Sequence, residues 1–242
     1  SAIIGIAQYG IFEYDNLGRR PQGSLTHYMT YSGLLMLVSG MAAARLLFHG
    51  RDRTWPALVM PALLVALALT FTRSAMVGTC VGIGLLFVLK DLRLLLLAPI
   101  VAGLFTAVAP EQITARLYST FDPQNETVRD RIAMMRTGVR LVRDYPLMGV
   151  GPDMVEGVYA DYRDPAAVQE SNPHLHNVPI QIAAERGLPA LFVWIALIVA
   201  VTRGLVHLLR TSTYRFLPAG GLAAVGSMLA AGMFEYNFGD SE

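Results

Sequence analysis

The sequence is poor in charged residues, in lysine and in cysteine. Only 15% of its 242 residues are charged, against about 25% in an ordinary soluble domain. Because 54% are hydrophobic and the mean hydropathy is +0.46, this shortage of charge indicates a membrane protein. The net charge of +1 gives no strong positive field, so nucleic acid is not an expected partner. Cys80 is the only cysteine, which excludes a disulfide within the chain, and Lys90 is the only lysine, so the cationic side chains are almost all arginines.

Long apolar runs predict membrane spans, each of which needs about 20 residues. The first is residues 28–48. Residues 56–89 contain one formal charge, Arg73, and as a single helix they would be about 50 Å long, too long for a hydrocarbon core of about 30 Å. We therefore expect two helices that meet near Arg73. The remaining spans are expected at residues 92–109, 188–208 and 216–235, which makes the fold class an all-α polytopic membrane protein with about six transmembrane helices.

The basic residues of the turns predict an orientation, because positive charge marks the cytoplasmic side of a membrane protein. The turns at residues 45–54, 90–93 and 203–215 hold most of this charge and are assigned to the cytoplasm. The N-terminal segment, the Arg73 turn, a long loop and the C-terminal tail then face outward. The predicted organisation is an N-terminal outward segment with four spans (1–109), a large outward loop (110–187), and two further spans with an outward tail (188–242). The chain begins at Ser1 rather than Met, and we expect it to be a piece of a longer protein.

Arg73, in "LTFTRSAMVG", lies between two apolar spans. A charged side chain at a helix centre in the membrane costs about 2.5 kcal/mol or more, and less near the interface. One interpretation is an arginine that extends its guanidinium group from a span end to the interface. The other is a partner for an anion such as phosphate. The small residues that follow would permit close helix packing and so hold Arg73 inside a bundle.

Residues 126–145 predict an amphipathic helix with Asn125 as its N-cap and an end near Pro146. Apolar residues recur every three or four positions at Val128, Ile132, Met135, Val139 and Val142. On a helical wheel, one stripe beside this apolar face contains Arg129, Arg136, Arg140 and Arg143, which is typical of the water-facing or headgroup-facing edge of an interfacial helix. Arg131 lies on the opposite border of the apolar face, and is therefore the better candidate for a functional site.

Two glycines follow this helix in "PLMGVGPDM". Gly149 and Gly151, on either side of Val150, could let the backbone approach a ligand, and an ordinary turn is the alternative interpretation.

The stretch "NPHLHNVPIQIAAERGLP" places two histidines, His174 and His176, before a short helix expected at residues 178–186. Asn177 suits the N-cap, and Gly187 suits the C-terminal end. The positive end of the helix dipole disfavours an imidazolium at His176, and a neutral imidazole is what a general base needs near pH 7. A metal ligand and a structural histidine are the alternatives, although no third ligand of suitable spacing stands out.

These segments together resemble the O-antigen ligase and O-antigen polymerase superfamily of bacterial envelope glycosyltransferases. "RRPQGSL" is similar to an Arg-x-x-Gly segment of that family and places its arginine at Arg20, a residue that an interfacial anchor would also explain. "LTFTRSAMVG" matches at Arg73, and the loop helix that ends in Pro-Leu-x-Gly-x-Gly places its important arginine at Arg131. "HNVPIQIAAERG" fits the pattern His-Asn, nine residues, Gly, which places the histidine at His176 and favours the ligase branch.

The resemblance implies a GT-C-like all-α enzyme of the bacterial inner membrane whose active site faces the periplasm. Its donor would be a glycan on undecaprenyl diphosphate, and its acceptor a lipid A–core sugar or another glycan, with membrane lipids as surroundings. Arg73, Arg131 and Arg20 would hold the diphosphate without a metal or another cofactor, and His176 would act as base in an inverting transfer, with substrate contacts from His174, Asn177, Gly149 and Gly151.

Other activities stay open from the sequence. A polymerase of O-antigen or exopolysaccharide and a protein O-oligosaccharyltransferase share these motifs. A transporter of lipid-linked glycans would place its polar groups at mid-membrane, whereas here they gather on one side. A non-catalytic membrane scaffold would give no new glycosidic product.

Overall fold

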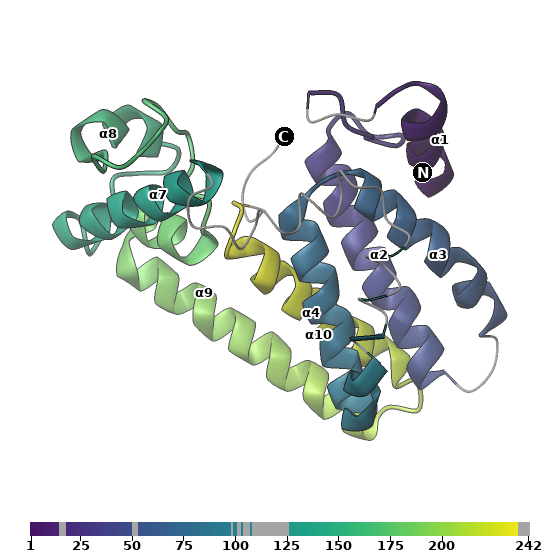
Figure 1. Cartoon of the computed structure of the whole chain (residues 1–242). Coiled ribbons are helices and arrows are strands. Elements are labelled where there is room, and N and C mark those ends of the chain that lie inside the picture. The colour runs from purple at the N-terminus through teal and green to yellow at the C-terminus, as the bar shows by residue number, and fades with distance from the viewer. Residues whose placement is uncertain are drawn as a thin grey trace. The chain divides into compact units, whose positions relative to one another are not determined.

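The computed structural model describes residues 1–14, 18–49, 53–97, 99, 100, 103, 107 and 126–236. Its regular elements over these residues are all helices, which makes the protein an all-α membrane protein (Figure 1). The chain forms two compact units. Unit 1 contains Ser1–Leu117 and Thr202–Ala230, and unit 2 contains Tyr118–Val201 and Ala231–Ser241.

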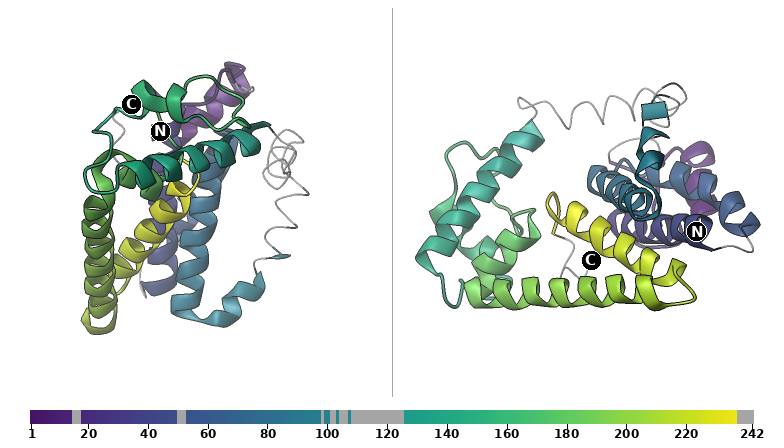
Figure 2. Two further views of the ribbon diagram at one scale, coloured as in Figure 1. Left: turned by 90° about the vertical axis from the view of Figure 1, so that its left-hand side faces the viewer. Right: turned by 90° about the horizontal axis from the view of Figure 1, so that it is seen from below.

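Unit 1 is a group of apolar helices. Helix α2 (Tyr28–Phe48) packs against α3 (Thr54–Leu69) and α4 (Arg73–Lys90), and α1 (Ala2–Ile11) packs on α3. A short 3₁₀ helix, η1 (Leu92–Leu97), follows α4. The C-terminal end of α9 (Val178–Thr211) and most of α10 (Phe216–Gly232) complete the unit, whose helices are visible in two further orientations in Figure 2.

The predicted spans agree with these helices in most places. The bounds of α2 are those predicted, and the run 56–89 divides at Thr70–Thr72 into α3 and α4. The spans expected at 188–208 and 216–235 correspond to the main part of α9 and to α10. The span expected at 92–109 begins with η1, and most of its remainder lies outside the described residues. Among the described helices, α2, α4 and α9 are long and apolar enough to cross a membrane, whereas α1, α3 and α10 are apolar but shorter.

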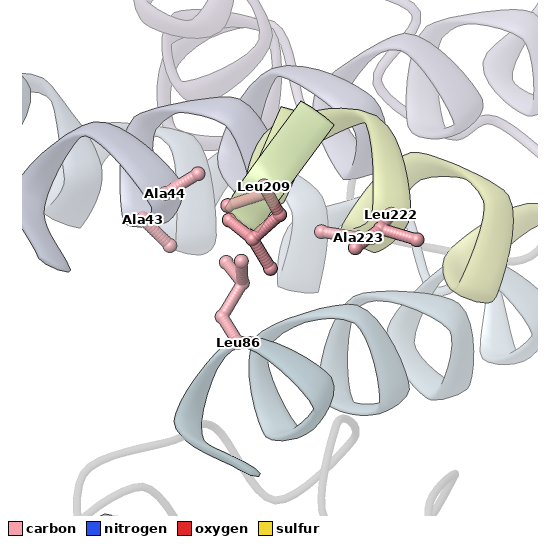
Figure 3. Close-up of a cluster of buried hydrophobic side chains, with 7 residues drawn as sticks. Ala43, Ala44, Leu86, Leu209, Leu222 and Ala223 are labelled. Atoms are coloured by element: carbon pink, nitrogen blue, oxygen red, sulfur yellow. The ribbon is translucent and has the colours of Figure 1, made fainter. Parts of the chain in front are cut away.

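Small side chains bring α2, α4, α10 and the end of α9 into close contact. Figure 3 shows Leu86 of α4 and Leu209 of α9 pointing into the space between the alanines of α2 and Leu222 and Ala223 of α10. Leu86 is fully buried there. Gly82, one turn earlier on α4, faces Ser227 of α10 so closely that an added Cβ would overlap the Ser227 hydroxyl.

Unit 2 contains α7 (Glu126–Asp144), α8 (Val155–Tyr162) and the N-terminal part of α9. Helix α7 matches the predicted amphipathic helix to within one residue, while its expected N-cap, Asn125, lies outside the described residues. Its buried face is not its most apolar stripe, because Ile132 and Val139 stay 43% and 59% exposed. The buried face consists instead of Asp130, Ala133, Met134, Thr137, Gly138 and Leu141.

Helix α9 contains both the predicted short helix 178–186 and the span predicted at 188–208. The two parts meet at Gly187, whose φ of +79° is non-helical. A side chain at this position would meet the backbone of Leu147. The kink therefore separates a short segment that packs within unit 2 from the apolar segment that follows it.

We predict that Gly82→Leu destabilises the helix packing of unit 1, because the new side chain has no room beside Ser227 and overpacking costs about 1–3 kcal/mol. The matched control is Gly84→Leu on the same helix, since a Cβ at Gly84 meets nothing within 4 Å. Thermal unfolding of the two variants in detergent, followed by circular dichroism, checks this. Equal unfolding midpoints would contradict the packing described for α4 and α10.

Candidate functional site

His176 lies in the turn that leads into α9. Its φ of +49° is left-handed, an uncommon conformation for a residue with a side chain. The next residue, Asn177, caps α9 as predicted, because the backbone N–H of Ile180 donates to its Oδ1 at 3.1 Å. The Asn177 side-chain amide also donates to the carbonyl of Met233 at 3.3 Å, and Asn177 is buried. This one side chain therefore connects the start of α9 to the turn that follows α10.

That turn brings a carboxylate to the histidine. Glu235 Oε1 lies 2.5 Å from His176 Nδ1, and Glu235 Oε2 lies 3.4 Å from a terminal guanidinium nitrogen of Arg131. One carboxylate thus contacts a histidine from the α9 turn and an arginine from α7. These three side chains form the candidate site, which lies within unit 2.

The exposure of the three side chains decreases from the imidazole to the carboxylate. The His176 side chain is 27% exposed, that of Arg131 22% and that of Glu235 13%. Glu235 is thus the most enclosed of the three groups, while the imidazole stays partly exposed. This order suits a pair in which the carboxylate orients the imidazole.

The charge of Glu235 decides the direction of its hydrogen bond. Burial raises the pKa of Glu235, but its hydrogen bond to His176, the charge of the His176 ring when that ring is protonated, and the positive charge of Arg131 outweigh burial, so the pKa lies below the ordinary value of 4.5. An ionised carboxylate can only accept, so Nδ1 of His176 carries the hydrogen and donates it. In the neutral imidazole, Nε2 is then the free acceptor, which is the arrangement a general base needs.

A buried polar network holds the backbone next to His176. The backbone N–H of Leu175 donates to Gln181 Oε1 at 2.7 Å, and the Gln181 amide donates to Glu185 Oε1 at 2.7 Å. Both Gln181 and Glu185 are fully buried. The same Glu185 oxygen accepts from the backbone N–H of Asp153 at 3.2 Å, and the other oxygen accepts from Arg186 at 3.1 Å. The network therefore joins the histidine turn, α9 and the turn before α8.

The two glycines after α7 belong to the same backbone contact. Val150 and Gly151 donate their N–H groups to the carbonyls of Ala184 and Glu185 at 2.8 and 2.9 Å. Gly149 has φ +66°, and a side chain there would overlap the Glu185 backbone. Close packing against α9 thus accounts for Gly149, and the predicted contact of Gly149 and Gly151 with a ligand stays a prediction.

The structure places the remaining predicted residues as follows. The His174 ring packs on that of Tyr236, with centroids 5.1 Å apart. Arg73 is the first residue of α4 in unit 1, and it is only 7% exposed. The Arg20 guanidinium, also in unit 1, lies over the ring of Tyr28 at 4.3 Å. Of the predicted arginines, the structure brings Arg131 to the histidine through Glu235, whereas a position of Arg73 and Arg20 beside it stays a prediction.

Sequence reasoning missed Glu235, together with helices α1 and α8. Glu235 is 59 residues from His176 and 104 from Arg131 along the chain, so no local pattern links them. A usable signal exists, because Glu235 is the only acidic residue of the span predicted at 216–235 and lies at the end of that span next to the predicted outward tail. Within the described residues, His, Cys, Asp and Glu form no group of three or more that could hold a metal ion.

A family model described as O-Antigen ligase matches residues 57–195. The match covers more than half of the chain, and it includes Arg73, Arg131 and His176 but ends before Glu235. None of the curated proteins compared with the chain matches it.

We predict that Glu235→Gln lowers the stability of the folded protein at neutral pH by about 2 kcal/mol, the scale of a hydrogen bond to a charged group. The folded pKa of Glu235 lies below its ordinary value, so the ionised carboxylate contributes stability above about pH 4.5, and this contribution is lost as the pH falls through the folded pKa. The difference in unfolding midpoint between the wild-type protein and Glu235→Gln should therefore become smaller at acid pH. The measurement is the unfolding midpoint in detergent across pH, with Glu156→Gln on the surface of α8 as the control. A difference in unfolding midpoint that stays constant down to acid pH would contradict the pairing of Glu235 with His176 and Arg131.

Proposed function

Because the chain belongs to the O-antigen ligase family, we propose that it transfers a glycan from undecaprenyl diphosphate to an acceptor hydroxyl at the periplasmic face of the bacterial inner membrane. The family makes the protein an O-antigen ligase/polymerase-type membrane glycosyltransferase. The donor, the acceptor and the side of the membrane are the parts that we propose. The observation that carries the proposal is the contact of Glu235 with both His176 and Arg131, because it joins a base to an anion-binding group.

His176 acts as the general base in this scheme. Its Nδ1–H donates to Glu235, so Nε2 is free to take the proton from the acceptor hydroxyl. The acceptor oxygen then forms a bond to the anomeric carbon as the bond from that carbon to the diphosphate oxygen breaks. The electron pair leaves with the diphosphate, and attack from the opposite face inverts the anomeric configuration. Glu235 stabilises the imidazolium that forms, as a carboxylate does in catalytic triads.

Arg131 holds the diphosphate and stabilises the charge that develops on it as it leaves. A guanidinium group has five N–H donors in a rigid fork, so a terminal nitrogen can contact Glu235 while other donors bind phosphate oxygens. We assign Arg73 and Arg20 to the same diphosphate on the basis of their motifs. Arg73 is suited to this role by its position at the N-terminus of α4, where the helix dipole also favours an anion. Arginine charge thus replaces a metal ion in this proposal.

The spacing of the histidine motif favours a ligase, with a lipid A–core sugar as acceptor. The pattern His-Asn, nine residues, Gly runs from His176 to Gly187. In the structure, Asn177 caps α9 and Gly187 forms its kink, so this spacing corresponds to one short helical segment. A polymerase or a protein O-oligosaccharyltransferase would use the same donor with another acceptor. Purified protein, labelled carrier-linked glycan and each acceptor in turn separate these activities, and transfer to none of them would contradict the proposal.

We predict that His176→Ala reduces transfer to background, because no group remains to take the hydroxyl proton, while binding of the carrier-linked donor persists. The control is His207→Ala, which removes an exposed histidine of α9. Product formation and donor binding are measured on the same reconstituted preparations. Normal transfer by the His176 variant would remove the base from the mechanism.

We predict that Arg131→Lys reduces the rate of transfer by about 100-fold, the scale of losing one preorganised donor to a developing charge. Lysine preserves the charge but replaces the fork with a single ammonium group. The matched control is Arg136→Lys, an exposed position on the same helix. An unchanged rate of transfer in Arg131→Lys together with a reduced rate in Arg136→Lys would contradict the assignment of Arg131 to the diphosphate.

A further inference from the structure

Helix α7 carries a second surface that the transfer reaction does not use. We define the α7 outer face by the apolar residues Ile132, Met135 and Val139 and the flanking arginines Arg129, Arg136 and Arg143. Ile132 and Val139 are 43% and 59% exposed, and the three arginines are exposed as well. Arg131 is not part of this face, because its guanidinium contacts Glu235 on the other side of the apolar stripe.

Contacts on the opposite side of α7, which we call its inner face, determine which way the outer face points. Asp130 accepts hydrogen bonds from the backbone N–H groups of Val168 and Gln169 at 2.8 and 3.2 Å. Thr137 accepts from the N–H of Asp164 at 3.1 Å, and a side chain at Gly138 would overlap that of Ile180. Polar and close-packed contacts therefore bind the inner face to the rest of unit 2. Turning the apolar stripe inward would break all of them.

Helix α9, which is long and apolar enough to cross a membrane, begins in the same unit. Phe192 and Val193 of α9, shortly after the Gly187 kink, are 67% and 71% exposed, as expected for side chains in contact with lipid. In the left-hand view of Figure 2, α7 runs across the upper end of α9 rather than along it. This orientation would let α7 lie along the surface of a membrane that the apolar part of α9 crosses.

We propose that the α7 outer face docks on the membrane, with its apolar stripe at the level of the headgroup–acyl boundary and its arginines on anionic phospholipid headgroups. An apolar stripe beside a row of cations is the pattern by which surface helices bind anionic bilayers. Arginine suits this position because its aliphatic stem lies along apolar surface while its guanidinium group reaches the phosphates. Docking would hold unit 2 at the depth of a lipid headgroup, and it does not depend on which glycan or acceptor the enzyme uses.

The test places a fluorescent label at position 139 of the whole 242-residue chain. Cys80→Ser removes the only cysteine, and Val139→Cys or, as the control, Asp161→Cys on α8 supplies a site for a nitrobenzoxadiazole label. The protein is reconstituted in vesicles of phosphatidylcholine with phosphatidylglycerol. We expect the label at 139 to emit at shorter wavelength, to be quenched by phospholipid with a shallow spin label, and to resist aqueous iodide. We expect the label at 161 to be quenched by iodide.

The role of the arginines is tested by adding Arg136→Gln and Arg143→Gln to the chain labelled at 139. Removal of these charges should increase quenching by iodide, as should replacement of phosphatidylglycerol by phosphatidylcholine in the unsubstituted chain. Equal iodide quenching at 139 and 161 would overturn the proposal. Shielding of the label at 139 from both quenchers would also overturn it, because another protein surface would then cover the stripe. Because none of these measurements follows glycan transfer, their outcome neither supports nor contradicts the proposed function.

Discussion

The carboxylate of Glu235, shared between His176 and Arg131, is the interaction on which the proposed chemistry depends. An enclosed carboxylate is unfavourable unless it is paired, and here two cationic or hydrogen-bonding partners lower its pKa in spite of its burial. The same pairing sets the tautomer of His176 and leaves Nε2 as an acceptor. It also places a forked cation near the base. In the proposed mechanism, acid–base chemistry and anion binding are thus joined through one side chain.

The rest of unit 2 keeps this carboxylate and its partners in place. Asn177 connects the histidine turn to the turn that holds Glu235, and the buried pair Gln181 and Glu185 fixes the backbone before the histidine. Gly149 and Gly187 let two backbone segments approach more closely than any side chain would allow. Much of the histidine motif therefore serves to position one imidazole. This explains why its residues are spaced as one short helical segment with a cap and a kink.

Local signals made most of the helices predictable and pointed to His176 and Arg131 as candidates, whereas contacts between distant parts of the chain could not be predicted. The bounds of α2 and the division of α3 from α4 follow from apolar runs and from the charge of Arg73. Helix α8 was missed because eight residues are too few for a clear period. The buried face of α7 could not be predicted because it includes the polar residues Asp130 and Thr137. Their burial is favourable only because they accept hydrogen bonds from backbone groups at residues 168 and 164, which are distant in the sequence. The pairing of Glu235 could not be predicted for the same reason.

The position of the hydrogen on the His176 ring decides whether Glu235 orients this imidazole. The protein has five histidines, and in a sample labelled with nitrogen-15 histidine the signals of His176 are those that disappear in His176→Gln. We predict that at neutral pH these signals report a hydrogen on Nδ1, and that Glu235→Gln redistributes it between the two ring nitrogens. A hydrogen on Nε2 that is unaffected by Glu235→Gln would show that Glu235 does not orient the imidazole.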